Sequence, residues 1–559
     1  MRNYRPLALF ILTVGLASLL GDITVSAAPQ TKKEKRLQKK AEAAQAATPA
    51  NSTTPVKPIV GPVGPKDATA LARLIDEQIT KKLTEAKVGP SPLCSDEEFL
   101  RRAYLDLTGV IPPAEKAQAF LDATSPTKRA KLIDELLESP NFGRHLADVW
   151  QAKLMPRDSG NRFVLREPLV KWLEDQFNKN TPWNQFVFSL ISASGTVEDN
   201  PAVTYFLANR SVDKLTDGVT QHFLGVQLTC AQCHNHPFAE YKQTEYWGMA
   251  EFFSKVRPDN PKNANKGGDN TKIGVQEGTG RTKLKDFFPD AAKTVPAKFL
   301  GGPAPKLSPT EPYRPILARW MTAPDNPYFA RAMVNRTWAV LFGTGFVNPI
   351  DDMHEGNPPS HPDLLAAVAQ NFAANGFDIK YLYRSICNRQ TYQRTSKPIA
   401  ANEKDDHLFS HMTVKVLSPE QLYDSLATIT GAETTVRERM GKGAGKKGPA
   451  NGRDGFVQFF LAGAEATHPT EYDAGIPQAL RLMNSRVTGN PGLIRQFASP
   501  GDRPAAVIER IYLTALSRRP TATETGRLTS YVAKASTPAE AYGDILWAVL
   551  NSSEFTMVK

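Results

Sequence analysis

Apolar side chains recur three or four positions apart along most of the chain after residue 67, which is the spacing of one face of an α-helix. The clearest stretch has five such residues, Phe99, Leu100, Ala103, Tyr104 and Leu107. Ser95 and Glu98 precede them in the pattern of a capping box, and Gly109 follows in the pattern of a C-terminal cap. We therefore predict a helix that begins after Ser95 and ends before Gly109.

Similar signals predict further helices in both halves of the chain. The expected segments are Ala130–Leu137, Val212–Leu228, Tyr328–Leu341 and Leu364–Phe372, together with helices that open at Pro182, Pro419 and Pro538. The helix after Pro419 should end at Gly431. The residues that should cap the helices opening at Pro362, Pro419 and Pro538 are Ser360, Ser418 and Thr537, respectively. Because few segments alternate like a strand, we predict a mainly α fold without internal repeats.

The stretch 257–311 interrupts this pattern, since it is rich in Asn, Lys, Gly and Asp and has little periodicity. We expect an irregular linker or insertion there. It would separate a helical domain at 67–256 from a second helical domain at 312–559. Thr434–Arg453, rich in Gly and Lys, is expected to be a loop within the second domain.

The N-terminus has the features of a secretory signal peptide over residues 1–27. Arg2 and Arg5 precede an apolar run from Leu7 to Leu20, and the small residues up to Ala27 suit a signal peptidase. An uncleaved anchor is the alternative. We expect an exported protein that is periplasmic, cell-surface or secreted, with no transmembrane span after cleavage, because no later segment is long and apolar enough.

Most of the positive charge lies in the following segment, 28–66, which is rich in Ala, Lys and Pro and is expected to be a flexible linker. Eight Lys or Arg and two Glu lie between Thr31 and Lys66, against a net charge of +11 for the whole chain. The rest of the chain is thus near balance. Because basic and aromatic residues are not interleaved, nucleic acid is not an expected partner.

The most informative motif is Cys230-Ala231-Gln232-Cys233-His234-Asn235-His236. Cys-x-x-Cys-His is the attachment pattern of c-type haem: two thiols about one helical turn apart reach the two vinyl groups, and the adjacent His ligates the iron. Covalent attachment of this kind requires export, which agrees with the signal peptide. We therefore expect Cys230, Cys233 and His234 to bind haem c.

Other interpretations of this motif remain open. Two Cys and the imidazoles of His234 and His236 also suit zinc or another transition metal, although four ligands within seven residues would need a very tight turn. A disulfide or redox dithiol between Cys230 and Cys233 is a third interpretation. The two remaining cysteines, Cys94 and Cys387, could form a disulfide, which the sequence does not decide.

A six-coordinate haem would need a second axial ligand. The candidates are Met249, Met321, Met333, Met353, His222 and His354, and none has a distinctive context. A five-coordinate iron, open to a small ligand, is therefore also compatible with the sequence.

A second polar constellation lies between residues 351 and 361. Its candidate ligands for an alternative metal site, or members of a general acid–base pair, are Asp351, Asp352, His354 and His361. A structural role is favoured, because Arg331, Asn335 and Arg336 on the preceding helix could pair with the acids. The other imidazoles, at His145, His407, His411 and His468, are not expected to have ligand-like neighbours.

Several long motifs together resemble a known exported two-domain family. The Cys230 motif with Phe223–Val226, and the segment Phe99–Gly109, resemble a planctomycete cytochrome-c-like domain. Asn326–Arg331, Asn357–Pro362 and Leu550–Phe555 resemble the planctomycete-specific domain that usually follows it. The resemblance implies export and the two-domain division, whereas the activity of the family is unassigned and its haem is inferred from the same motif.

Three functional hypotheses follow for a protein whose activity as an enzyme is undecided. The first is an electron-transfer or redox protein with haem c and a redox partner. The second is a structural or polysaccharide-binding protein of the cell surface, stapled at the Cys-His cluster by a metal or a disulfide. The third is a metal-dependent hydrolase that uses the Asp351–His361 loop. The sequence does not indicate the oligomeric state.

Overall fold

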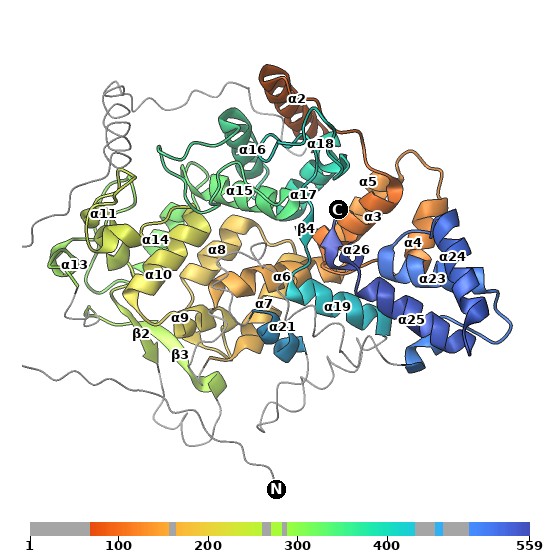
Figure 1. Ribbon diagram of the computed structural model, residues 1–559. Coiled ribbons are helices and arrows are strands. Elements are labelled where there is room, and N and C mark those ends of the chain that lie inside the picture. The colour runs from red at the N-terminus through yellow and green to blue at the C-terminus, as the bar shows by residue number, and fades with distance from the viewer. Residues whose placement is uncertain (1–67, 156–163, 260–269, 282–287, 431–452, 462–490) are drawn as a thin grey trace, which may run out of the picture. The chain divides into compact units, whose positions relative to one another are not determined.

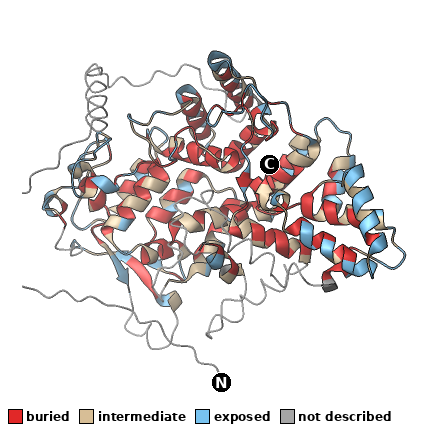
Figure 2. Ribbon diagram, viewed as in Figure 1, coloured by how far each residue is buried: buried red, intermediate tan, exposed pale blue. Residues whose placement is uncertain are grey.

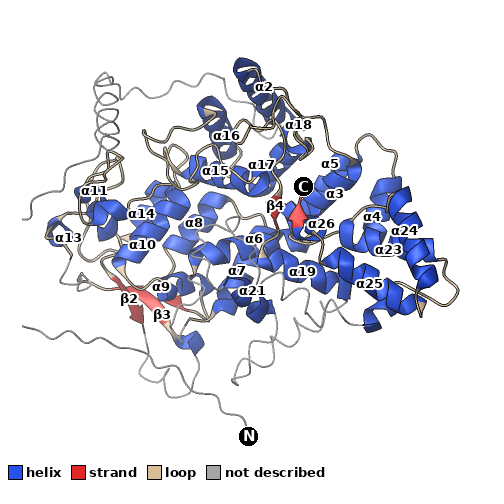
Figure 3. Cartoon of the chain, in the orientation of Figure 1, coloured by secondary structure: helices blue, strands red, loops and turns tan. Residues whose placement is uncertain are grey.

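The computed structural model describes residues 68–155, 164–259, 270–281, 288–430, 453–461 and 491–559 (Figure 1). The expected signal peptide 1–27, the linker 28–66, almost all of the loop 434–453 and His468 lie outside these described residues. The described part is mainly helical, as predicted, with a few very short strands (Figure 3). None of its helices is both long and apolar enough to cross a membrane.

The helices of the first half are short and closely consecutive. They are α2 (Ala68–Ala86), α3 (Asp96–Thr108), α4 (Ala114–Asp122), α5 (Lys128–Glu138), α6 (Pro140–Leu154), α7 (Arg166–Asn178), α8 (Trp183–Ile191), α9 (Thr204–Ala208), α10 (Val212–Val219) and α11 (Gln243–Glu251). The predicted Ser95 cap and Gly109 end of α3 are confirmed: the Ser95 hydroxyl accepts the amide of Glu98, and Gly109 adopts φ 71° at the C-terminal end. The capping box is only half formed, because the Glu98 carboxylate binds Arg102 and the Ser396 amide instead.

The helices of the second half begin after residue 290. They are α13 (Ala291–Thr294), α14 (Arg314–Met321), α15 (Phe329–Phe342), α16 (Pro362–Ala374), α17 (Ile379–Cys387), α18 (Gln390–Gln393), α19 (Pro419–Thr430), α21 (Arg453–Leu461), α23 (Pro504–Leu516), α24 (Ala522–Lys534), α25 (Pro538–Leu550) and α26 (Ser553–Thr556). Ser418 caps α19 as predicted, since its hydroxyl accepts the amide of Gln421. The N-cap of α16 is His361 rather than Ser360, because the Ser360 hydroxyl instead contacts the His361 ring.

Strands occur within the segment that was expected to be irregular. β2 (Val256–Asp259) pairs antiparallel with β3 (Gly274–Glu277), and β1 (Gly195–Thr196) pairs with the other side of β3. Gly274 suits this central position, because a Cβ there would collide with the backbone of Gly195. The prediction of a wholly irregular 257–311 segment was therefore wrong for the strand residues 257–259 and 274–277, and for the short helix α13 at Ala291–Thr294.

One large hydrophobic core draws on both sides of that segment (Figure 2). Trp183 of α8 stacks on Phe329 of α15 with ring centroids 6.3 Å apart, and Trp150 of α6 lies 4.7 Å from Trp183. A second core is formed mainly by residues after 417, with Leu105 and Ile111 added from the region of α3. The side chains of α3 therefore help to build both cores.

The C-terminal residues are held by two buried arginines of α3. Arg101 donates hydrogen bonds to the carbonyls of Ala515 and Phe555, at 2.9 and 2.7 Å, and Arg102 donates to that of Lys559 at 2.8 Å. Next to them, β4 (Lys415–Val416) pairs antiparallel with β5 (Met557–Val558). Side chains of α3 are thus hydrogen-bonded to the backbone of residues near the C-terminal end of the described chain.

Candidate functional site

The helix before the Cys-His motif ends earlier than predicted. After α10, the residues Thr220–Leu224 form one π-helical turn, and Gly225 closes it with φ 69°. A Cβ on Gly225 would lie 3.2 Å from both the Met353 sulfur and Ala332. The Met353 amide also donates a 2.9 Å hydrogen bond to the Gly225 carbonyl. Gly225 is therefore the point where the second polar loop approaches the Cys-His motif.

The backbone of the Cys-His motif is clamped onto the start of α11. The side-chain amide of Gln243 donates to the Cys233 carbonyl at 2.6 Å, and the Trp247 indole donates to the Gln232 carbonyl at 3.0 Å. The backbone amide of Gln243 donates to the side chain of Asn235 at 3.0 Å. These bonds fix the motif through its main chain and through Asn235, and they use neither thiol.

Both thiols of the motif are free and exposed. Cys230 lies in the short 3₁₀ turn Thr229–Gln232, and Cys233 follows it directly. The two other cysteines, Cys94 and Cys387, are free and buried, and burial raises the pKa of each thiol. A Cys94–Cys387 disulfide is thus not formed, and Cys230 and Cys233 are the reactive candidates by exposure.

The ring of His234 is held in a tautomer that leaves Nε2 free to act as a ligand. Its Nδ1 lies 2.7 Å from the carbonyl oxygen of Asn235. Because a carbonyl can only accept, Nδ1 must carry the proton, and the free lone pair of the neutral ring is on Nε2. A metal-bound imidazole usually donates its second N–H to such an acceptor. His234 is also exposed, so a group bound to Nε2 would not need to displace core side chains.

His236 has the opposite arrangement. Its Nδ1 accepts the backbone amides of Phe238 and Ala239, at 3.2 and 3.0 Å, so the proton of the neutral ring is on Nε2. Burial lowers the pKa of His236, and the nearby His354 lowers it further. The His236 ring therefore orders the turn after the motif, and its Nε2 is a hydrogen-bond donor.

The second polar loop meets this turn, although the sequence gives no signal of the contact. The rings of His236 and His354 lie 6.3 Å apart, and the Tyr241 hydroxyl donates to the Met353 carbonyl at 3.3 Å. The Nδ1 of His354 accepts the amide of Gly356 at 3.1 Å, and its Nε2 lies 3.5 Å from the Asp352 carboxylate. The lone pair on Nδ1 of His354 is therefore also used by a backbone amide, and its Nε2–H points toward Asp352.

The other two candidates of that loop are held elsewhere. Asp351 forms a buried ion pair with Arg336, which also donates to the Gln221 carbonyl at 3.3 Å. The pairing expected between the acids and the preceding helix, α15, thus occurs through Arg336. Asn335 of the same helix instead binds the backbone of Val347 and Ile350. Asp351 anchors the loop next to the π-helical turn.

His361 is buried between two aromatic rings. It is 4% exposed, and its ring centroid lies 5.9 Å from that of Phe346 and 5.4 Å from that of Phe409. Burial lowers the pKa of His361 to about 4, with a further decrease from Lys82 and His407 that Asp405 opposes. The ring is therefore neutral at pH 7 and belongs to the core.

This environment predicts a pH-dependent stability. An unfolded histidine has a pKa of about 6.5, so between pH 6.5 and 4 the unfolded state binds a proton that the folded state excludes. Stability contributed by His361 is present above pH 6.5 and is lost as the pH falls. We expect His361→Gln to remove about 2 kcal/mol of the decrease between pH 7 and pH 5.

Urea unfolding at the two pH values measures this difference. His411→Gln is the control, because its imidazole is only half-buried. An unchanged pH dependence in His361→Gln would contradict the assignment of a buried neutral ring.

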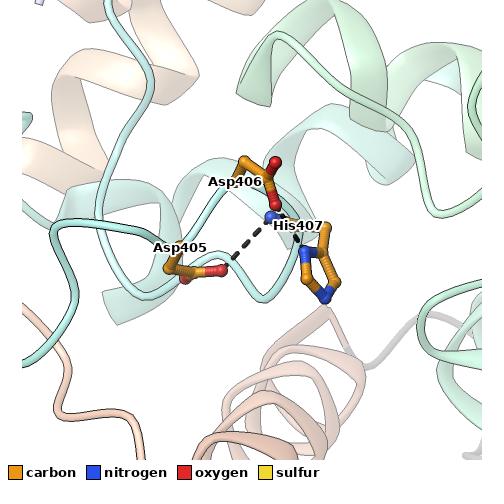
Figure 4. Close-up of side chains that lie close together, drawn as sticks. All are labelled: Asp405, Asp406 and His407. Carbon is orange, nitrogen blue, oxygen red and sulfur yellow. Dashed lines mark hydrogen bonds and ion pairs between the residues drawn. The ribbon is translucent and has the colours of Figure 1, made fainter.

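The candidate metal ligands do not converge into one coordination sphere. Among the residues that the structure describes, three or more ligand atoms lie within 4.8 Å of one another only in the group Asp405, Asp406 and His407 (Figure 4). Neither the set Cys230, Cys233, His234 and His236 nor the set Asp351, Asp352, His354 and His361 forms such a group.

The Asp405 trio is explained by a surface turn. The Asp405 carboxylate accepts the amides of His407, Leu408 and Ser410, at 3.2, 2.8 and 2.9 Å. Burial alone would raise the pKa of Asp405, but a hydrogen bond from the Ser410 side chain and these backbone hydrogen bonds lower it. His407 contacts the exposed Asp406 at 2.5 Å, so our expectation that His407 lacks ligand-like neighbours was wrong. The Asp405 carboxylate, which would have to ligate an ion, is nevertheless already hydrogen-bonded to the backbone of the turn.

Comparison with known families matches two consecutive regions of the chain. Residues 74–258 match the family PSCyt2, described as a protein of unknown function (DUF1549), and residues 313–467 match PSD1, also described as a protein of unknown function (DUF1553). No curated protein and no solved structure matches the chain. The Cys-His motif and the π-helical turn lie in the first region, and the loop of Asp351 to His361 lies in the second. The chain therefore contains a PSCyt2 domain followed by a PSD1 domain.

Proposed function

We propose that this protein carries one covalently attached haem c and transfers electrons. Cys230 and Cys233 would form the thioether bonds, and His234 would ligate the iron through Nε2. The observation that carries the proposal is the hydrogen bond from Nδ1 of His234 to the Asn235 carbonyl. It leaves the Nε2 lone pair of an exposed ring free, beside two exposed thiols.

The residues around the motif fit this group better than they fit a zinc ion. A structural zinc site gathers four donor atoms into one tetrahedron, whereas the described Cys and His donors of this motif are not gathered. His236 and His354 turn their lone pairs toward backbone amides, which leaves His234 as the ligand-competent ring of the three. Bound haem iron would supply one-electron chemistry.

The rest of the chain has supporting roles in this proposal. Gln243 and Trp247 hold the backbone of the motif in place before attachment, and the exposed thiols remain accessible to the attachment machinery. Because that machinery works outside the cytoplasm, the proposal includes export directed by residues 1–27. The exposed position of His234 would allow electron exchange with a redox partner at the surface.

The decisive experiment is expression of the full chain in a periplasm that contains haem-attachment machinery. We expect a Soret band and an intact mass increased by one haem, and both should be lost in Cys230→Ser/Cys233→Ser. The matched control is Cys94→Ser/Cys387→Ser, which removes the same number of thiols and should keep the haem.

His234→Ala separates the iron ligand from the thioether bonds. We expect this variant to retain the added mass but to shift the Soret band, because the thiols remain while the ligand is lost. A colourless wild-type protein without added mass would refute the proposal, and metal analysis of the same sample would then test the alternative ion.

A further inference from the structure

Among the residues that the structure describes, Phe238 is the most exposed large hydrophobic side chain, at 81%. It lies in the turn directly after the Cys-His motif, four residues beyond His234. This turn is held in place, since the Phe238 amide donates to Nδ1 of His236 at 3.2 Å, and a Cβ on Gly356 would lie 3.3 Å from the Phe238 carbonyl oxygen. A single exposed ring is common on protein surfaces, so the groups around it decide whether it marks an interaction surface.

The surroundings of Phe238 are acidic. Four carboxylates lie in this turn, at the start of α11 and in the loop that meets them, those of Glu240, Glu245, Asp352 and Glu355. Lys242 is the one Lys or Arg in the two segments 234–245 and 352–359. With histidines counted as neutral, four acids and one base give these segments a net charge of −3.

This negative charge is not neutralised by ion pairs with basic side chains of the described chain. Asp352 lies 3.5 Å from Nε2 of His354, and Glu245 accepts the backbone amide of Lys242 at 3.1 Å, so the partners of both are an imidazole and an amide. The other two carboxylates are exposed to solvent and form no ion pair within the described residues. All four therefore remain able to attract a cation from outside the chain.

The two acidic segments are far apart in the sequence but meet at Tyr241. The Tyr241 hydroxyl donates to the Met353 carbonyl at 3.3 Å, which joins the turn to the loop. Burial, and then Tyr328, raises the pKa of the Tyr241 hydroxyl, and the three carboxylates other than Glu240 raise it further. Segments 234–245 and 352–359 thus form one acidic surface around an exposed aromatic ring, which we call the Phe238 surface.

We propose that the Phe238 surface docks a basic protein that presents lysine or arginine side chains around an apolar patch. The ring of Phe238 would pack on the apolar patch, and the carboxylates would face the cations. Charge complementarity of this kind speeds encounter and sets orientation, which suits the small interfaces of transient electron-transfer pairs. Because the Cys-His motif leads directly into this surface, the partner would be a redox protein. That identity rests on the haem attachment proposed above, whereas the docking itself does not.

Surface plasmon resonance of the full chain, with a lysine-rich cytochrome c as the probe, tests the docking. We expect a dissociation constant in the micromolar range at about 20 mM salt, and binding at least about tenfold weaker at about 200 mM salt, where exposed charges are screened. The same probe with acetylated lysines keeps its fold but loses its positive charge, and it should not bind.

The charges are tested by Glu240→Gln/Glu355→Gln, which removes two exposed carboxylates at constant size. This variant should bind the probe at least about tenfold more weakly, mainly because association is slower. The matched control is Glu115→Gln/Glu403→Gln, which removes the same charge from two exposed glutamates outside the Phe238 surface and should bind like wild type.

The aromatic ring is tested by Phe238→Ala, which leaves every charge in place. We expect binding about tenfold weaker, mainly through faster dissociation, because an aromatic anchor is lost. Tyr531→Ala is the control, since Tyr531 of α24 is another exposed aromatic side chain, at 45%, and lies outside the two segments. Circular dichroism verifies that each variant is folded.

The same titration with Cys230→Ser/Cys233→Ser separates this proposal from that of haem attachment. The variant should dock like wild type, because neither thiol lies in the Phe238 surface. A wild-type protein that carries haem but does not bind the probe overturns the docking proposal and leaves haem attachment intact. A colourless wild-type protein that binds the probe supports the docking and refutes the redox identity of the partner.

Sedimentation equilibrium of the chain alone tests a second copy as the occupant. An apparent mass that rises with concentration in wild type, but not in Phe238→Ala, assigns the surface to self-association and overturns the proposal. Equal binding of the native and acetylated probes also overturns it, as does wild-type binding by both the charge variant and Phe238→Ala.

Discussion

Replacing Trp338 by alanine is expected to lower the free energy of unfolding by about 3–5 kcal/mol, the usual cost of removing a fully buried large aromatic side chain. Trp338 of α15 is 0% exposed, and its ring lies 4.3 Å from Phe342 and 4.2 Å from Phe346. The side chain also contacts Phe409, with ring centroids 5.3 Å apart. Alanine would leave a cavity among three aromatic rings that cannot easily collapse.

Urea unfolding followed by circular dichroism measures this loss. Trp547→Ala is the matched control, because Trp547 is 39% exposed on α25, whereas Trp338 is fully buried. We expect the control to change the free energy of unfolding by less than about 1 kcal/mol. Equal effects of the two substitutions would contradict the central packing role of Trp338.

Replacing Lys415 by methionine is expected to destabilise the protein by about 3–5 kcal/mol, because it leaves a buried carboxylate without its cation. The ammonium of Lys415 lies 2.6 Å from the Asp106 carboxylate, and the two side chains are 8% and 3% exposed. It also donates to the carbonyls of Val340 and Leu341, at 3.0 and 2.8 Å. The Lys415 side chain therefore neutralises an acid of α3 and donates hydrogen bonds to two carbonyls in the last turn of α15.

The double variant Lys415→Met/Asp106→Leu distinguishes this cause from a loss of packing. With both charges removed, no ion is left unpaired, so the double variant should be more stable than Lys415→Met alone. Urea unfolding of the two single variants and the double variant gives the coupling between the residues. Additive losses would show that the ion pair is not the origin of the effect.

Local signals in the sequence predicted the helix starts well where the capping side chain binds an amide only three residues away. Ser95, Ser418 and Thr537 each accept the expected backbone amide three residues later, because a cap depends only on nearby atoms. The end of α10 was placed too late, although Gly225 gave a local signal for it. The strands β2 and β3 were missed, since segments so short and polar show no clear alternation of apolar and polar residues.

The candidate site was predictable only in its local part. The spacing of Cys230, Cys233 and His234 is visible in the sequence, and so is the concentration of acids and imidazoles after Asp351. The contact between His236 and His354 joins positions more than a hundred residues apart, and no periodicity encodes it. The proton position on each ring likewise depends on backbone atoms that only the folded turn supplies.

The anchoring of the C-terminal residues by Arg101 and Arg102 has a consequence for how the chain can fold during synthesis. The acceptor carbonyls of Phe555 and Lys559 lie 454 and 457 residues after their donors, so a growing chain presents the two guanidinium groups long before their partners exist. Closing so long a loop is slow compared with forming local helices. The region around α3 therefore reaches this hydrogen bonding only after translation has delivered Phe555 and Lys559.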